Sequence, residues 1–151
     1  MSETGASVES LPLDQWTCQQ QLLTFVQLMD AGDAEAAAAL LTPDAQWNRQ
    51  GQIVQGAEAI AAVIAARPPD RTVRHHLCNL VVRIEAPDRA SSRAYYAAYI
   101  SHGPAETRSA GLPERSGDYY AGFVKTALGW RISYLRAHRL FEAGGGPAGR
   151  R

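Results

Sequence analysis

The stretch TVRHHLCNLVVRIEAPDRASSRAYYAAYISH, residues 72–102, is the most informative part of the chain about its fold. Its β-branched and aromatic residues predict two strands, Thr72–Glu85 and Ala90–His102. The segment Ala86-Pro87-Asp88-Arg89 between them has the composition of a turn. Two antiparallel strands of this length must twist, so we expect a curled sheet with a concave face.

The chain on either side of this hairpin supplies the rest of an α+β domain. A loop containing Gly103 and Pro113 follows it, long enough to act as a lid. Two further strands are predicted, Gly117–Ala127 and Trp130–Phe141, joined by a turn at Leu128-Gly129. Before the hairpin, helical periodicity and end signals predict three helices, and a short hairpin surrounds Gln50-Gly51. These elements are the helices Asp14–Ala31, Ala34–Leu41 and Ala57–Ala66, and the strands Ala45–Arg49 and Gln52–Val54.

We therefore predict a cone-shaped half-barrel, with three N-terminal helices packed on a curved, mainly antiparallel sheet around one apolar pocket. One domain is expected over residues 12–141. Residues 1–11 and 142–151 are expected to be disordered termini, the second because of its run of glycines.

The composition excludes several function classes. The chain has 151 residues and zero formal net charge, so no global field attracts nucleic acid or an anionic membrane. No apolar run is long enough to span a bilayer, and the polar start is unlike a secretory signal, so a cytoplasmic location is expected. The two cysteines, Cys18 and Cys78, are expected to be small buried hydrophobes.

No motif for a cofactor or metal is present. The sequence has no phosphate-cradling glycine motif and no GxSxG elbow. His75 and His76 are adjacent in a strand, so they point to opposite faces and cannot share one ion. We expect neither a metal nor another cofactor.

Several short motifs, in this order and spacing, resemble the SnoaL-like branch of the nuclear transport factor 2-like superfamily. The resemblance runs from about Trp16 to Phe141. The motifs are Met29-Asp30-Ala31-Gly32-Asp33, Pro43-Asp44-Ala45-Gln46-Trp47, Gly56, Arg74-His75-His76-Leu77-Cys78-Asn79, Gly117-Asp118-Tyr119 and Gly129-Trp130-Arg131-Ile132. The superfamily holds isomerases, dehydratases, cyclases, hydrolases and binding proteins, so its fold does not select a function.

The resemblance implies a catalytic pair, Asp30 and His75. In scytalone dehydratase, bile-acid dehydratase and hexachlorocyclohexane dehydrochlorinase, an aspartate at the end of the first helix orients a histidine that acts as general base. Independently, Asp30 follows Val26 on an apolar stripe and ends a helix, where its charge opposes the macrodipole by ~0.3–1 kcal/mol. Such a carboxylate needs a partner, and a histidine supplies one. The alternative is a solvated helix-end aspartate and an exposed strand histidine.

Other residues are candidates for binding the substrate. The resemblance implies that Trp47 forms a pocket wall, and it places Tyr96 at a pocket position and His102 near one. Tyr119, also a candidate, matches a family tyrosine that is more often structural. Arg136 approaches the cavity from the last strand, and Phe25 occupies the position of a polar helper in the related enzymes. A phenyl ring cannot donate a proton, so any elimination needs its acid elsewhere, and Tyr96, His102 and Arg136 are candidates. Arg49 stands about where ketosteroid isomerase carries an acid, which argues against an isomerase of that design.

The sequence favours a cofactor-free lyase or isomerase that acts on a small apolar molecule such as a polyketide, steroid or terpenoid. Dehydration, another β-elimination and cyclisation all suit a His75–Asp30 base. The alternative is a non-catalytic binding or assembly protein of the same fold. Apolar residues on both faces of Leu77–Ile84 suggest a subunit contact, in a homodimer or a homotrimer.

Overall fold

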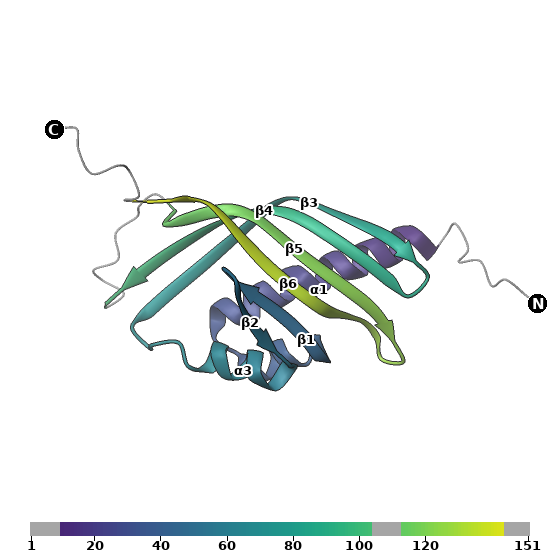
Figure 1. Cartoon of the computed structure of the whole chain (residues 1–151), viewed down its shortest axis with the longest axis horizontal. Helices are drawn as coiled ribbons and strands as arrows, with labels where there is room; N and C mark the ends of the chain where they lie inside the picture. Colours follow the sequence, from purple (N-terminus) through teal and green to yellow (C-terminus); the bar gives the residue numbers. More distant parts are fainter. Residues whose placement is uncertain (1–9, 104–112, 144–151) are drawn as a thin grey trace, which may run out of the picture.

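The structure, a computed structural model, describes residues 10–103 and 113–143. Helices and strands follow in the predicted order, three helices with a short hairpin and then a four-strand meander (Figure 1). The elements are α1 (Ser10–Ala31), α2 (Ala34–Ala38), β1 (Leu41–Arg49), β2 (Gln52–Gln55), α3 (Ala57–Ala65), β3 (Arg71–Ala86), β4 (Arg89–His102), β5 (Arg115–Thr126) and β6 (Gly129–Glu142).

The strands form one six-stranded sheet in the order β2-β1-β6-β5-β4-β3. Neighbours are antiparallel except β1 and β6, which are parallel. Strands β2 and β3 lie at the two edges, so the sheet curls without closing. The predicted fold class, helices on a curved and mainly antiparallel sheet, is confirmed.

Irregularities in the strand pairing bend the sheet. The β3–β4 register shifts between Cys78 and Val81, where Asn79 has a positive φ of 53°. Asparagine is one of the few residues that enters the left-handed region readily, and a bulge of this kind increases the local bend and twist. A second shift lies between Ser116 and Gly117 in the β5–β6 pair. A Cβ atom at Gly117 would stand 2.1 Å from the carbonyl oxygen of His138, so only glycine fits there.

The helices cover one face of the curled sheet (Figure 1). Helix α1 packs against β3 and β6, and α3 packs against β1 and β2. The core between these layers contains fully buried apolar side chains from helix and sheet. The largest are Leu22, Phe25, Ile60, Tyr119, Phe123, Ile132 and Leu135. None of the helices that the structure describes is long and apolar enough to cross a membrane.

The second helix is shorter than predicted because the residues at its predicted end pair with the sheet. The carbonyl oxygen of Leu40 accepts a hydrogen bond of 2.9 Å from the backbone N–H of Ile132, and Leu41 pairs with Ile132. Leu41, predicted as the last residue of the helix, therefore begins β1. Tertiary pairing outweighs local helix propensity at this junction.

The domain also extends slightly beyond its predicted limits. Helix α1 begins at Ser10, and Glu142 still belongs to β6. The remainder of the predicted disordered termini, residues 1–9 and 144–151, lies outside the described residues. So does most of the predicted lid, residues 104–112.

Candidate active site

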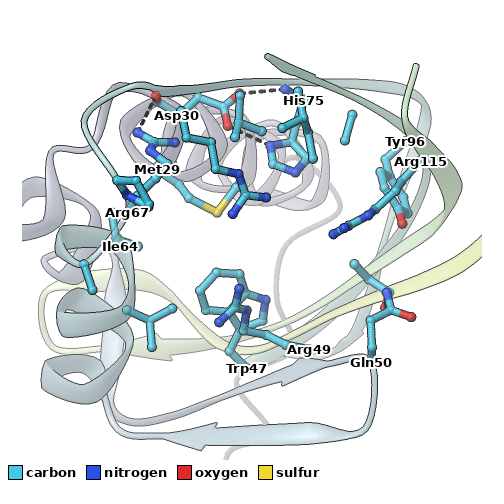
Figure 2. Close-up of a pocket in the computed structure, with 18 of the residues that line it drawn as sticks. Met29, Asp30, Trp47, Arg49, Gln50, Ile64, Arg67, His75, Tyr96 and Arg115 are labelled. Carbon is cyan, nitrogen blue, oxygen red and sulfur yellow. Dashed lines mark hydrogen bonds and ion pairs between the residues drawn. The ribbon is translucent and has the colours of Figure 1, made fainter. Parts of the chain in front are cut away.

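A pocket of about 550 Å³ opens between the helices and the concave face of the sheet. Figure 2 shows Asp30 and His75 on one side of it and Trp47 and Arg49 on the other. This volume suits a small organic ligand. Its lining comes from α1, α3 and every strand of the sheet. The residues are Met29, Asp30, Trp47, Arg49, Gln50, Gln52, Val63, Ile64, Ala66, Arg67, Pro68, Arg71, Val73, His75, Tyr96, Ala98, Ile100, Arg115 and Ala137.

Asp30 holds His75 at two points. Its Oδ1 lies 2.7 Å from the Nδ1 of the His75 ring, and its Oδ2 accepts a 2.6 Å hydrogen bond from the His75 backbone N–H. The Asp30 side chain is only 6% exposed, whereas that of His75 is 20% exposed and lines the pocket. The alternative of a solvated aspartate and an unrelated surface histidine is therefore wrong.

The local sequence explains why these two groups meet. Asp30 lies in the last turn of α1, beside buried Met29, and the helix ends at Gly32, whose φ of 81° suits glycine. The guanidinium of Arg67 donates a 2.8 Å hydrogen bond to the Asp30 carbonyl oxygen and so fixes the helix end. On β3 the alternation directs Val73 and His75 into the pocket.

The contact determines which ring nitrogen of His75 is free. An ionised carboxylate only accepts hydrogen bonds, so Nδ1 must carry the proton that it shares with Asp30. The lone pair then lies on Nε2, for which the described residues offer no hydrogen-bond partner. A histidine held in this tautomer can take a proton at Nε2, and the carboxylate then stabilises the imidazolium.

The neighbouring His76 is excluded from the pocket, as strand alternation predicts. It is exposed on the other face of β3, where its ring lies 5.0 Å from that of Tyr99. The two histidines are adjacent on the same strand but lie in different surroundings, so His76 is a matched control for His75.

Trp47 and Tyr96 lie where they were predicted, in the pocket wall. Both are buried, and the ring centroid of Tyr96 is 6.4 Å from that of His75. Burial raises the pKa of Tyr96, against the lowering effect of Arg115 and Arg139. Its hydroxyl therefore stays protonated at neutral pH and can donate a hydrogen bond or a proton in the pocket.

Phe25 and Tyr119, predicted as binding residues, belong to the core instead. Phe25 is fully buried in the core between the helices and the sheet, and it does not line the pocket. Tyr119 is 2% exposed and packs edge-on against Tyr96 at 6.1 Å between ring centroids. Burial, with smaller effects of Asp30 and Tyr96, raises the pKa of Tyr119.

His102 and Arg136 also lie outside the pocket. His102 is the last residue of β4 and is exposed, two positions beyond Ile100, the final pocket residue of that strand. Arg136 is exposed on the outer face of β6, with its guanidinium 5.9 Å from the centre of the Tyr120 ring. Its neighbours Leu135 and Ala137 point inward, so alternation turns Arg136 away. Neither residue lines the pocket, so neither is placed there as the acid.

Four arginines line the pocket, although the sequence predicted an apolar lining and drew attention only to Arg49 among them. They are Arg49, Arg67, Arg71 and Arg115. Partial burial, together with the positive charges of Arg71 and Arg115, lowers the pKa of Arg49. These residues come from β1, the segment after α3, β3 and β5, and no local motif links them.

A metal site does not appear within the part of the chain that the structure describes. No group of three or more His, Cys, Asp or Glu side chains is placed to hold an ion there. The acid–base and cationic side chains described above are therefore the groups through which these residues can act on a ligand in the pocket.

Comparisons with solved structures agree with the fold described above. An NTF2-like protein with a cystatin-like fold from Novosphingobium aromaticivorans is 24% identical, with a TM-score of 0.65, over 85% of this chain and 81% of the other. A protein of the NTF2-like family from Streptomyces avermitilis, described as a candidate dehydratase, is 17% identical, with a TM-score of 0.71, over 86% and 98%. A candidate scytalone dehydratase from N. aromaticivorans is 16% identical, with a TM-score of 0.66, over 82% of each chain. At these identities the likeness concerns the fold alone.

Residues 13–136 match the SnoaL-like domain. The chain therefore belongs to the SnoaL-like family, within the NTF2-like fold, and the resemblance predicted from its motifs is confirmed. No curated protein sequence gives a significant match.

Proposed function

We propose that the protein is a cofactor-free lyase or isomerase in which His75 is the general base and Asp30 its positioning partner. The observation that carries the proposal is the double contact of Asp30 with His75, at 2.7 Å to the ring Nδ1 and 2.6 Å to the backbone N–H. It leaves Nε2 of a pocket-lining ring free to accept a proton. Relatives in this fold that are described as dehydratases add support.

A dehydration illustrates the proposed chemistry. Nε2 of His75 takes a proton from a carbon next to a carbonyl group, and the electrons of the C–H bond form a carbon–carbon double bond. The hydroxyl on the neighbouring carbon leaves with its bonding pair and receives a proton, so that water is released. The proton comes from the imidazolium itself or from the Tyr96 hydroxyl, which lines the same pocket. Tyr96 then recovers a proton from the imidazolium, and both groups return to their starting states.

Proton abstraction can be tested before the natural substrate is known. We would incubate the protein with 1-tetralone in D₂O and follow deuterium entry at the carbon beside the carbonyl by mass spectrometry. The bicyclic β-hydroxy ketone 3-hydroxy-1-tetralone would report elimination, because loss of water yields 1-naphthol. The expected result is exchange or elimination above background that His75→Gln removes.

The matched control is His76→Gln, one residue along the same strand but outside the pocket. It should retain the activity of the unaltered protein. If His75→Gln and His76→Gln behave alike, the general-base role of His75 is wrong. If neither probe is turned over but both are bound, the result favours a binding protein of the same fold.

A further inference from the structure

The charge of the pocket is unlike that of the chain as a whole. The full sequence has 15 basic and 15 acidic residues, but the pocket lining contains four arginines and a single carboxylate, Asp30. Both oxygens of that carboxylate are engaged by His75. Among the described residues, the arginines therefore gather around a cavity whose lining contains only one carboxylate.

The arginines differ in how far their charge is already satisfied. Arg115 lies 3.4 Å from an oxygen of Glu114 and 3.7 Å from one of Glu142, so its charge is partly balanced. Arg67 donates to the Asp30 carbonyl oxygen. For Arg49, Arg67 and Arg71, residues 10–103 and 113–143 contain no carboxylate within ion-pair distance.

Arg71 and Arg115 each have a buried Nε without a hydrogen-bond partner among the described residues, and of the two only Arg71 also lacks a carboxylate within ion-pair distance there. A buried donor that lacks a partner is costly, and a guanidinium more so because it carries charge. Arg71 also borders a second hollow of about 420 Å³, which shares Asp30, Arg67 and Pro68 with the pocket. The cationic side of the site thus extends beyond the main cavity.

Apolar side chains line the same pocket. Met29, Trp47 and Ile64 are buried there, and the Arg49 guanidinium lies 4.9 Å from the centre of the Trp47 ring. In Figure 2 the Arg115 side chain reaches inward beside Tyr96, across the cavity from Ile64. Apolar and cationic side chains therefore face the same space.

We propose that the pocket binds an organic anion, with its carboxylate or phosphate group against Arg49, Arg71 and Arg115 and its hydrocarbon part against the buried side chains of Met29, Trp47 and Ile64. Guanidinium groups recognise both oxyanions through paired hydrogen bonds. The anion occupies the space in which these arginines otherwise repel one another. This inference rests on the proposed function for the statement that the ligand is a substrate, but its binding claim stands alone.

Binding of a matched set of probes tests the proposal without turnover. Naphthalene-2-carboxylate, 2-naphthyl phosphate and the neutral methyl naphthalene-2-carboxylate share one bicyclic body and differ in charge. By isothermal titration calorimetry at low salt, we expect at least one anion to bind tenfold or more tightly than the ester, about the effect of one charged hydrogen bond. The tighter of the two anions identifies the oxyanion that the site prefers.

Variants separate recognition from folding. Arg71→Gln and Arg49→Gln should each weaken binding of the preferred anion by at least about tenfold and leave binding of the ester unchanged. Arg136→Gln removes an equal charge from the outer face and should change neither. In the absence of ligand, the melting temperature of Arg49→Gln should equal or exceed that of the unaltered protein, because a repulsive charge is removed.

The proposal is overturned if the ester binds as tightly as both anions, if no probe binds, or if Arg49→Gln and Arg71→Gln match Arg136→Gln. The proposed catalytic role is tested separately. His75→Gln should still bind the anion, so arginine-dependent binding without any proton abstraction supports the anion site and contradicts the lyase or isomerase. Proton abstraction from neutral probes without any preference for anions supports the lyase or isomerase and contradicts the anion site.

Discussion

Asp30 contacts both the ring and the backbone of His75, with Oδ1 2.7 Å from Nδ1 and Oδ2 2.6 Å from the backbone nitrogen. The contact joins residues 45 positions apart, the last turn of α1 and the start of β3. It positions the histidine and ties a helix end to the edge strand of the sheet. The same carboxylate therefore links the packing of the domain to the chemistry proposed for its pocket.

Asp30→Asn should preserve the fold but remove activity. Asparagine has a single acceptor oxygen, so it cannot accept from both Nδ1 and the backbone N–H of His75. If the oxygen stays with the backbone, the amide NH₂ donates to Nδ1 and forces the proton onto Nε2, which then cannot act as a base. We expect turnover to fall by roughly 10³–10⁴-fold, as in other systems where the histidine tautomer is reversed. Circular dichroism should show an unchanged fold, and activity within tenfold of the unaltered protein would contradict the positioning role.

Tyr119→Phe should leave stability unchanged or raise it. The Tyr119 hydroxyl is buried and has no hydrogen-bond partner among the described residues, while its ring packs on Tyr96. Replacing an unpaired buried polar group by an apolar one of the same shape is neutral or stabilising, by up to about 1 kcal/mol. Urea denaturation measures the change. A loss of more than about 1 kcal/mol would mean that the hydroxyl has a partner, such as a buried water.

Asp14 should contribute to stability in a pH-dependent way. Burial raises its pKa, but hydrogen bonds from Trp130 and Lys125 outweigh that effect, so the pKa of Asp14 lies below its ordinary value of 3.8. Trp130 Nε1 donates at 2.8 Å and Lys125 Nζ at 3.1 Å to Oδ1. Because the folded pKa is the lower one, the contribution is complete above 3.8 and is lost as the pH falls below it.

The difference in free energy of unfolding between the unaltered protein and Asp14→Asn isolates this contribution. At pH 7 we expect the variant to be less stable by about 1–3 kcal/mol, the range for hydrogen bonds to a charged group. Urea titrations between pH 7 and pH 2 should show the gap narrowing on the acid side. A gap that stays constant down to pH 2 would contradict the assigned pKa direction.

The two cysteines should differ sharply in reactivity. Cys18 is fully buried, and burial raises the pKa of its thiol to about 12. Cys78 is exposed on the outer face of β3, contrary to the prediction that both are buried, because its position in the strand alternates with that of Leu77. A thiol-reactive dye should label one cysteine in the native protein, and Cys78→Ser should remove that label. Rapid labelling of Cys18 in native conditions would contradict the packing of α1.

Local patterns were sufficient to predict most of the fold. Strand alternation and turn residues marked the long hairpin, and helical spacing with Gly32 marked α1, within a few residues of its bounds. The end of α2 could not be predicted in this way. Leu40 and Leu41 have good helix propensity, and only the pairing with Ile132, a residue some ninety positions later, places them at the sheet.

The candidate site, like the fold, could be predicted from the sequence only in part. Asp30 and His75 were identified through the family resemblance, and the position of Asp30 on an apolar stripe at a helix end, where a carboxylate needs a partner, supported the pair. Arg136 and His102 were also assigned to the pocket. The alternation of side chains along β6 turns Arg136 outward, and His102 lies exposed at the end of β4. The arginine group had no local signal, because its members lie on separate elements and meet only when the sheet curls.

The tautomer of His75 shows whether Asp30 holds this ring ready to accept a proton. Long-range proton–nitrogen NMR spectra of ¹⁵N-labelled protein report which ring nitrogen of a neutral histidine carries hydrogen, and His75→Gln assigns the signal among the four histidines. We predict hydrogen on Nδ1 and a free Nε2, with Asp30→Asn reversing the pattern. A His75 ring that carries its proton on Nε2 in the unaltered protein would contradict the account.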